Sequence, residues 1–453
     1  MRPWLFVVAI SWAQDSLWID PRRKLRPYDL ERKRERWVWT AYPGVGYDPL
    51  RGFGAAIAAS ISYNGLRSDP NFAYAPYKYY LFVQAGGFVR ESRYLRLFYD
   101  MPWIAGRPYR FTARLNYREE SQGQFWGVGE RHIGERLAEK QLNQYEKRLR
   151  TLSLSPEGIW ETSLAQHNFY IRQWQGWFSG ERVVCRGLVR FIVGLRWTSE
   201  LLSSLNGRLY WLPSPGGDKV SARQRPTLID SAALGLIPSV QGLQIGLRRW
   251  QHRLFGGGAV VLDTRDFELN PTKGWLMEVS HESRFFPFST HKTTLSIRSY
   301  HFWYETALQN FLLSGAFHFL FTMTYGSNLP LTELYIHTRW ADGRLPNLLS
   351  GPSTLRAFRE NRFVSPVAYL LQYELRSRVA EVRVLKQHFT GGPVAFVDIA
   401  SGRDKLGTPL PVFTVMGVGI GARILWNMNT IMRADFAYGR EGWQLNFTTN
   451  HPF

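Results

Sequence analysis

Apolar and polar residues alternate along most of this chain, and the alternation is clearest near its end. In residues 443–453 one face is apolar and the other polar: Trp443, Leu445 and Phe447 against Gln444, Asn446, Thr448 and Asn450. A soluble sheet could show this pattern once, but here it recurs through the C-terminal half of the chain. A strand that crosses a membrane needs about 9–11 residues, with side chains facing lipid and lumen in turn. The pattern therefore favours membrane-spanning strands.

Sixteen segments fit this description, and their boundaries are least certain between residues 118 and 250. They are 52–63, 79–90, 93–101, 107–117, 146–156, 165–178, 183–197, 256–267, 274–286, 292–304, 312–325, 365–379, 392–400, 412–426, 430–439 and 443–453. In a soluble sandwich the polar faces would form the outside. Long, similar strands without intervening helices favour a closed barrel, because closure leaves no unpaired edge in lipid. We predict an all-β fold: a transmembrane antiparallel β-barrel of sixteen strands.

Two stretches break the strand pattern. Residues 130–145 are charged and would form a helix or an excursion, and residues 198–243, rich in Ser, Gly and Pro, predict a long extracellular loop. An even number of strands would place both chain ends on the periplasmic side.

Composition agrees with a barrel. The chain has 18 Trp, 22 Tyr and 29 Phe, which aromatic girdles at the two membrane interfaces would use. No stretch approaches the roughly 20 apolar residues of a spanning helix. The net charge of +20 comes from basic residues that alternate with apolar ones, so we expect them in the lumen and at lipid phosphates, with no nucleic-acid partner.

A single cysteine, Cys185, excludes an intramolecular disulfide; because it lies in an apolar run, we expect a packed, inert thiol.

The N-terminal region predicts three parts. Residues 1–13, with Arg2, an apolar run and a small-residue end, are typical of a signal peptide. Residues 14–45 are Arg-rich and interrupted by prolines, and we interpret them as an extended periplasmic segment. Residues 46–453 would form the outer-membrane barrel.

Three segments together resemble the bacterial surface-antigen barrels, the superfamily that includes the assembly factors BamA and TamA. Residues 262–266 (Leu-Asp-Thr-Arg-Asp), followed by Pro271 and Gly274, are similar to the family's Asp-x-Arg-Asp strand end and periplasmic turn. Residues 351–359 are similar to its inward-folded extracellular loop, and 395–398 (Ala-Phe-Val-Asp) to the strand that faces this loop. Phe453 fits the family's C-terminal aromatic residue. The resemblance is close over residues 250–453 and weaker over the earlier strands. It implies that barrel-assembly machinery inserts the protein.

Alternation in residues 392–400 places Phe396 and Asp398 on the face opposite an all-apolar one, so Asp398 should point into the lumen. A lumenal carboxylate suits a bidentate bond with Arg356 of the loop. The resemblance implies that Arg356 and Phe358, with Asp398 and Phe396, tether the loop inside the barrel. The alternative is a solvated Arg356, with Asp398 paired to a wall arginine.

Two further features concern the same motifs. The family's Gly between Arg and Phe is Ala357 here. Alanine would be strained if that position required a positive φ, and tolerated if the glycine only allowed close packing. Asp263 and Arg265 share one face of their strand and would form a lumenal charge network.

The resemblance to assembly factors implies a role in outer-membrane biogenesis or in protein or lipid translocation. Such a barrel would open at the seam between strands 52–63 and 443–453, which includes Gly52, Gly54, Pro452 and Phe453. The glycines weaken side-chain packing there and Pro452 removes a ladder donor. The alternative is a permanently closed seam. The superfamily's assembly factors carry periplasmic substrate-binding domains, and residues 14–45 are too short for one. Outer-membrane lipid and lipopolysaccharide are the expected surroundings; client and cargo stay unidentified.

Two other function classes remain. A passive pore preferring anions would use lumenal Arg and Lys for selectivity. An enzyme would need a catalytic set of residues. No Gly-x-Ser-x-Gly elbow is present. The available histidines, which show no metal-ligand spacing, are His167, His281, His291, His301 and His318. We therefore expect no catalysis, no metal and no cofactor.

Overall fold

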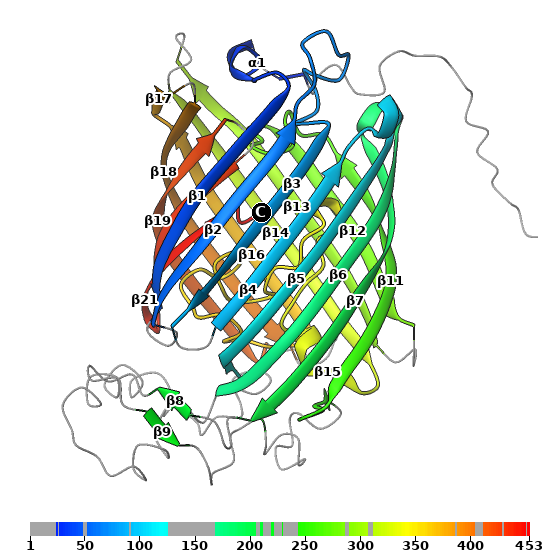
Figure 1. Cartoon of the computed structure of the whole chain (residues 1–453), viewed down its shortest axis with the longest axis vertical. Helices are drawn as coiled ribbons and strands as arrows, with labels where there is room; N and C mark the ends of the chain where they lie inside the picture. Colours follow the sequence, from blue (N-terminus) through cyan, green and yellow to red (C-terminus); the bar gives the residue numbers. More distant parts are fainter. Residues whose placement is uncertain are drawn as a thin grey trace, which may run out of the picture.

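In the computed structural model the chain forms a β-barrel (Figure 1). The structure describes residues 24–25, 27–48, 52–89, 92–125, 168–204, 209–211, 219–221, 229, 243–285, 290–306, 311–385, 387–403, 411–427, 430–449 and 451–453. The predicted signal peptide, the stretch 130–145 and the predicted strand 146–156 lie outside these residues. No helix in the described ranges is long and apolar enough to cross a membrane.

One antiparallel sheet of seventeen strands makes the wall, and neighbours in the chain are neighbours in the sheet. Its strands are β1 (Trp37–Asp48), β2 (Gly52–Tyr63), β3 (Tyr79–Phe88), β4 (Ser92–Met101), β5 (Tyr109–Gln124), β6 (Asn168–Val184), β7 (Val189–Ser204), β11 (Trp250–Asp263), β12 (Gly274–Arg284), β13 (Thr290–Glu305), β14 (Leu312–Gly326), β16 (Val367–Arg378), β17 (Ala380–Val384), β18 (Gln387–Arg403), β19 (Phe413–Trp426), β20 (Thr430–Gly439) and β21 (Gly442–Thr449). β16 and β17 follow each other and both pair with β18, so they form one interrupted strand.

The remaining elements are short. They are α1 (Pro27–Arg32), η2 (Ile104–Gly106), η4 (Cys185–Gly187), β8 (Leu209–Trp211), β9 (Lys219–Ser221), β10 (Leu243–Gln244), β15 (Leu329–Pro330), η6 (Leu331–Leu334) and η7 (Trp340–Asp342). The tight turn 185–188 and α1 lie at one end of the barrel, and the three longest connections (125–167, 205–249 and 327–366) leave from the other. Short turns face the periplasm in bacterial outer-membrane barrels. We therefore call the end with α1 periplasmic.

The first strand corrects the predicted domain boundary. The barrel begins with β1 at Trp37, whereas the sequence suggested an extended segment up to residue 45. Trp37 and Trp39 face outward and Val38 and Thr40 are buried, so the alternation was present. Pro43 obscured it; proline is tolerated there because β1 is an edge strand whose one ladder partner in the described sheet is β2.

The wall separates an apolar outside from a charged inside, as predicted. On β19 the outward side chains Met416, Val418 and Ile420 are exposed, whereas Arg423 is buried in the lumen. Lipid would cover the outward positions of a membrane barrel. Strand β7 runs to Ser204, so the extracellular connection starts after the predicted residue 198. Cys185 is exposed in a tight turn with φ 51°, which corrects the expectation of a packed thiol.

Candidate functional site

The connection 327–366 between β14 and β16 lies inside the barrel, where Figure 1 shows it as the yellow trace. Its apolar residues pack on inward side chains of the wall and form a buried cluster with them. Members from the loop are Leu348, Leu349, Leu355, Phe358 and Phe363; members from the wall include Leu320, Leu370, Phe396, Phe413 and Val415. The loop is therefore held partly by hydrophobic burial, and its charged residues decide where it attaches.

Arg356 makes the first attachment. Its Nε and Nη2 donate to Asp398 Oδ2 and Oδ1 at 2.8 and 2.7 Å, and its backbone N–H donates to Oδ2 at 3.1 Å. Its Nη1 donates to Glu374, and its guanidinium stacks 3.5 Å from the ring centroid of Phe396. Arg356 and Asp398 are both fully buried. The structure thus brings together Arg356, Phe396 and Asp398, three of the four residues that the sequence proposed for the tether. The fourth, Phe358, belongs to the same buried cluster as Phe396.

Neighbouring wall residues extend this contact over five strands. Glu374 on β16 also accepts from Arg376 and from Arg423 on β19, each at 2.7 Å. Arg423 donates to Asp435 on β20 at 2.6 Å. On β21, Asn446 Nδ2 donates to the carbonyl oxygen of Arg356 at 3.0 Å. Arg433 Nε on β20 lies 3.1 Å from Asp435 Oδ2. We call Arg356 and these wall partners (Asp398, Glu374, Arg376, Arg423, Asp435 and Arg433) the arginine anchor.

Ala357 fits its position without strain. It is fully buried and is not among the non-glycine residues with positive φ. A Cβ added to Gly417 on β19 would lie 2.4 Å from the Ala357 Cβ, and one on Gly439 would lie 3.0 Å from it. These two wall glycines therefore leave the space that the Ala357 methyl group fills. Of the two interpretations of this position, close packing is the one that the geometry supports.

A second attachment, absent from the sequence-based prediction, holds the other end of the loop. Glu333 on η6 accepts from Arg196 of β7 at 2.9 and 2.7 Å and from Lys292 of β13 at 3.2 Å. Arg196 also donates to Glu282 of β12 at 2.8 and 3.3 Å. All four side chains are buried. We call this group the glutamate anchor.

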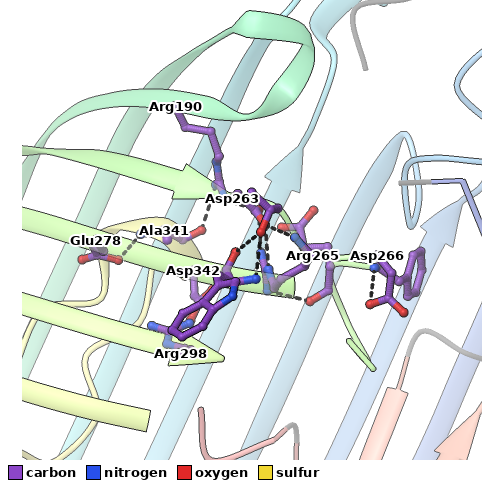
Figure 2. Close-up of polar contacts among 12 residues, drawn as sticks. Arg190, Asp263, Arg265, Asp266, Glu278, Arg298, Ala341 and Asp342 are labelled. Carbon is purple, nitrogen blue, oxygen red and sulfur yellow. Dashed lines mark hydrogen bonds and ion pairs between the residues drawn. The ribbon is translucent and has the colours of Figure 1, made fainter. Parts of the chain in front are cut away.

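Between the anchors, η7 rests on the wall (Figure 2). The backbone N–H groups of Trp340 and Ala341 donate to the two carboxylate oxygens of Glu278 on β12 at 2.9 and 3.0 Å. Asp342 accepts from Arg298 of β13 at 2.9 Å, and the Ala341 carbonyl oxygen accepts from Arg190 of β7 at 3.0 Å. Because several of these bonds go to loop backbone, the contact depends little on loop side chains.

Asp263 and Arg265, the predicted charge network, are buried and paired. Arg265 Nε and Nη2 donate to Asp263 at 2.9 Å each, and Arg190 Nη1 donates to Asp263 at 3.3 Å (Figure 2). Arg190 also makes a bidentate pair with Glu181 of β6 at 2.7 Å. Asp266 accepts from backbone N–H groups of its own turn. This network lies at the periplasmic end of β11 and supports the wall against which η7 rests.

The predicted seam needs a correction. β2 pairs on both sides, with β1 and β3: Gly54 has a ladder partner in each, and Gly52 is paired with Asp48 of β1. The described edge strands are β1 and β21, and no ladder joins them. Near the periplasmic end Thr40 Oγ1 lies 3.2 Å from Thr430 Oγ1, so side chains connect β1 to the start of β20 there.

The C-terminal residues do not continue β21, which ends at Thr449 rather than at the predicted residue 453. Phe453 is buried, with its ring 5.2 Å from that of His318 on β14. The carbonyl oxygen of Pro452 accepts from Arg339 Nη1 of the loop at 2.7 Å. Figure 1 places the C-terminus within the barrel. Pro452 and Phe453 thus belong to the lumen and not to the seam.

A segment before β1 crosses the periplasmic end. Lys33 donates to the carbonyl oxygens of Phe72 and Ala75 at 2.5 Å each, and its burial lowers its pKa to about 7. Arg32 makes a bidentate pair with Glu381 of β17 at 2.9 and 3.2 Å. The segment therefore connects the β2–β3 loop to β17, which lies on the other side of the β1–β21 gap.

Comparison with known families identifies the fold. A model of the Omp85 superfamily domain matches residues 218–449, just over half of the chain. The chain belongs to the Omp85 superfamily. This confirms the predicted surface-antigen barrel class and makes the protein an integral outer-membrane β-barrel. A second model, a domain of unknown function (DUF5982), matches residues 15–78, which include α1, β1 and β2 of this Omp85 protein.

Solved structures with a similar fold include two kinds of outer-membrane protein. BamA from Haemophilus ducreyi lacking POTRA domains 1–3 has 12% identity and a TM-score of 0.44, over 92% of this chain and 71% of that one. For CdiB from Acinetobacter baumannii the identity is 10% and the TM-score 0.42, and the match covers 93% of this chain and 66% of the CdiB chain. For CdiB from Escherichia coli the identity is 8% and the TM-score 0.47, and the match covers 91% of this chain and 61% of the CdiB chain. The Omp85 chain thus spans less than two thirds of either CdiB chain. No curated protein matches it.

Proposed function

We propose that this Omp85 barrel acts in outer-membrane biogenesis or in moving protein or lipid across the outer membrane, and that it works by opening between β1 and β21. One observation carries the proposal: every other pair of adjacent strands in the described sheet shares a hydrogen-bonded ladder, and this pair does not. Outer-membrane lipid and lipopolysaccharide would meet the opened edge. Barrel-assembly machinery would insert the protein, and its client is unidentified.

At the periplasmic end, the contacts across this gap among the described residues are between side chains. Thr40 contacts Thr430 as described, and the ring of Tyr42 on β1 lies 6.1 Å from that of Trp426 at the end of β19. A ladder would add a backbone hydrogen bond for each residue pair, each contributing about 0.5–1.5 kcal/mol net. A few side-chain contacts are easier to separate. The seam is therefore the place where the wall would open at least cost.

A disulfide across the seam tests the proposal. In a Cys185→Ser background, Thr40→Cys with Thr430→Cys would join β1 to β20 under oxidation. The matched control, Thr40→Cys with Ser60→Cys, joins β1 to its ladder partner β2, where the two hydroxyl oxygens lie 2.6 Å apart. Each variant replaces the native copy in the source bacterium, and mass spectrometry records the protein and lipid composition of the outer membrane.

We expect the seam disulfide to change the composition of the outer membrane in the same way as depletion of the protein does. A reductant should reverse this change. The control disulfide should leave the outer-membrane composition normal. If depletion changes the outer membrane but the oxidised seam variant behaves as wild type, opening at this seam is not the mechanism.

A passive anion-preferring pore is the second candidate, favoured by the lumenal arginines. The loop that fills the lumen opposes it. Planar-bilayer recordings separate the two: steady, large, anion-selective openings of the wild-type chain would support the pore. Small, erratic openings that enlarge in Arg356→Ala would support a barrel closed by its loop.

A further inference from the structure

A cavity lies at the periplasmic end of the lumen, between the arginine anchor and the segment that precedes β1. Lys24 and Leu25 line it from that segment, Arg376 from β16, Arg423 from β19 and His451 from the C-terminal residues. Nothing in the loop tether or in the seam accounts for this space.

The ionisable groups of the arginine anchor do not balance. Four arginines (Arg356, Arg376, Arg423 and Arg433) meet three carboxylates (Glu374, Asp398 and Asp435), so one positive charge is in excess. All seven side chains are at most 6% exposed. A buried charge is costly unless it is paired and hydrogen-bonded. Within these seven side chains, one arginine therefore has no carboxylate of its own.

Among the described contacts, Arg376 makes the fewest hydrogen bonds of the four arginines; Arg433 Nη1 is the other terminal nitrogen of the group without a partner. Arg376 Nε donates to Glu374, which it shares with Arg356 and Arg423, whereas its Nη1 and Nη2 are buried and have no hydrogen-bond partner in the described structure. Its guanidinium carbon lies 5.3 Å from the ring centroid of Phe453, a contact that leaves the in-plane N–H donors unused. Arg423 Nε on the same cavity is also without a partner.

The carboxylates that line the cavity are already engaged. Asp266 accepts from Phe267 N–H and from the Thr272 N–H and hydroxyl, and Asp29 lies 3.6 Å from Arg378. Neither carboxylate bonds to the terminal nitrogens of Arg376, which lines the same cavity. The planar fork of a guanidinium matches phosphate and carboxylate oxygens with two parallel bonds.

We propose that this cavity binds one phosphate-class oxyanion, held by Nη1 and Nη2 of Arg376 with Arg423 beside it. The ligand supplies a negative charge to the arginine anchor and so stabilises the loop in the lumen. The oxyanion comes from inorganic phosphate or from the headgroup of a phospholipid. This binding does not depend on whether the seam opens.

The test uses the full chain, purified in a neutral detergent and a phosphate-free buffer with ionic strength fixed by NaCl. Equilibrium dialysis measures bound radiolabelled inorganic phosphate, and intrinsic tryptophan fluorescence follows the thermal midpoint. A second arm replaces phosphate with short-chain phosphatidylglycerol. Arg376→Gln removes the fork. Arg383→Gln is the matched control, because the Arg383 side chain on β17 is 66% exposed.

We expect saturable binding of one phosphate per chain and a rise of the thermal midpoint of about 2–4 °C. Arg376→Gln should abolish both, and Arg383→Gln should keep both. Saturable binding of phosphatidylglycerol alone, lost in Arg376→Gln, would assign the headgroup as the source. If Arg376→Gln does not fold, Arg376→Lys keeps the charge without the fork and should bind at least tenfold more weakly. Absence of saturable binding of both ligands to the folded wild type, or binding unchanged in the Arg376 variant, overturns the proposal.

Discussion

The two anchors hold one loop with opposite charges. At the arginine anchor a cation of the loop, Arg356, enters a wall site that holds Asp398, Glu374 and Asp435. At the glutamate anchor an anion of the loop, Glu333, enters a wall site with Arg196 and Lys292. The sites lie on different arcs of the wall, β16 to β21 and β7 to β13. Each loop residue thus meets hydrogen-bonding partners of opposite charge at its own site.

The anchors also differ in what remains when the loop residue is removed. Without Arg356, Asp398 keeps one side-chain donor, Gln372 Nε2 at 3.2 Å. Without Glu333, Arg196 still has Glu282, and Lys292 still donates to the carbonyl oxygens of residues 333 and 336. The arginine anchor thus depends on the loop more strongly than the glutamate anchor does.

Arg356→Ala should therefore have the largest effect. Breaking a buried ion pair by removing one partner costs about 3–5 kcal/mol, because the other charge stays buried without compensation. We expect a large fall in the urea midpoint of the detergent-purified barrel and new protease cleavage between residues 327 and 366. Arg383→Ala, at an exposed site, should change neither. A midpoint equal to wild type would show that Arg356 does not contribute to holding the loop.

Glu333→Ala should have a smaller effect of about 1–3 kcal/mol, the usual cost of leaving a buried partner incompletely satisfied. The same urea titration measures it. The double variant with Arg356→Ala tests whether the anchors act separately, since independent sites add. A loss in Glu333→Ala that equals or exceeds the loss in Arg356→Ala would reverse the ranking of the two anchors.

The comparison also shows what the sequence could reveal. Asp398 was predictable because the opposite face of its strand is entirely apolar, which left only the lumen for a carboxylate, and the loop motif supplied Arg356 as its partner. Glu333 has no comparable signal. Its partner Arg196 is 137 residues away, and only the closed barrel brings the two together.

Two other features were missed for local reasons. Pro43 and the preceding arginines concealed the alternation of β1, so the seam was assigned to the wrong strand. The C-terminal strand shows continuous alternation, but Phe453 leaves it to pack beside His318, 135 residues earlier in the chain. A pattern with a period of two residues predicts which face a side chain takes while the strand lasts, but not where the strand ends.

The smallest effect tests whether the arginine anchor also depends on close packing. Gly417→Ala would place a Cβ 2.4 Å from that of Ala357, and overpacking of this kind costs about 1–3 kcal/mol. Because φ of Gly417 is not positive, the cost is steric and not conformational. Gly180→Ala on β6, where an added Cβ meets nothing within 4 Å, is the control. Adding Ala357→Gly should recover most of the loss in the urea midpoint, because it removes the colliding methyl group. If the losses in urea midpoint of Gly417→Ala and Ala357→Gly simply add in the double variant, the loop does not pack on β19 at this point. The arginine anchor would then be held by its charged contacts alone.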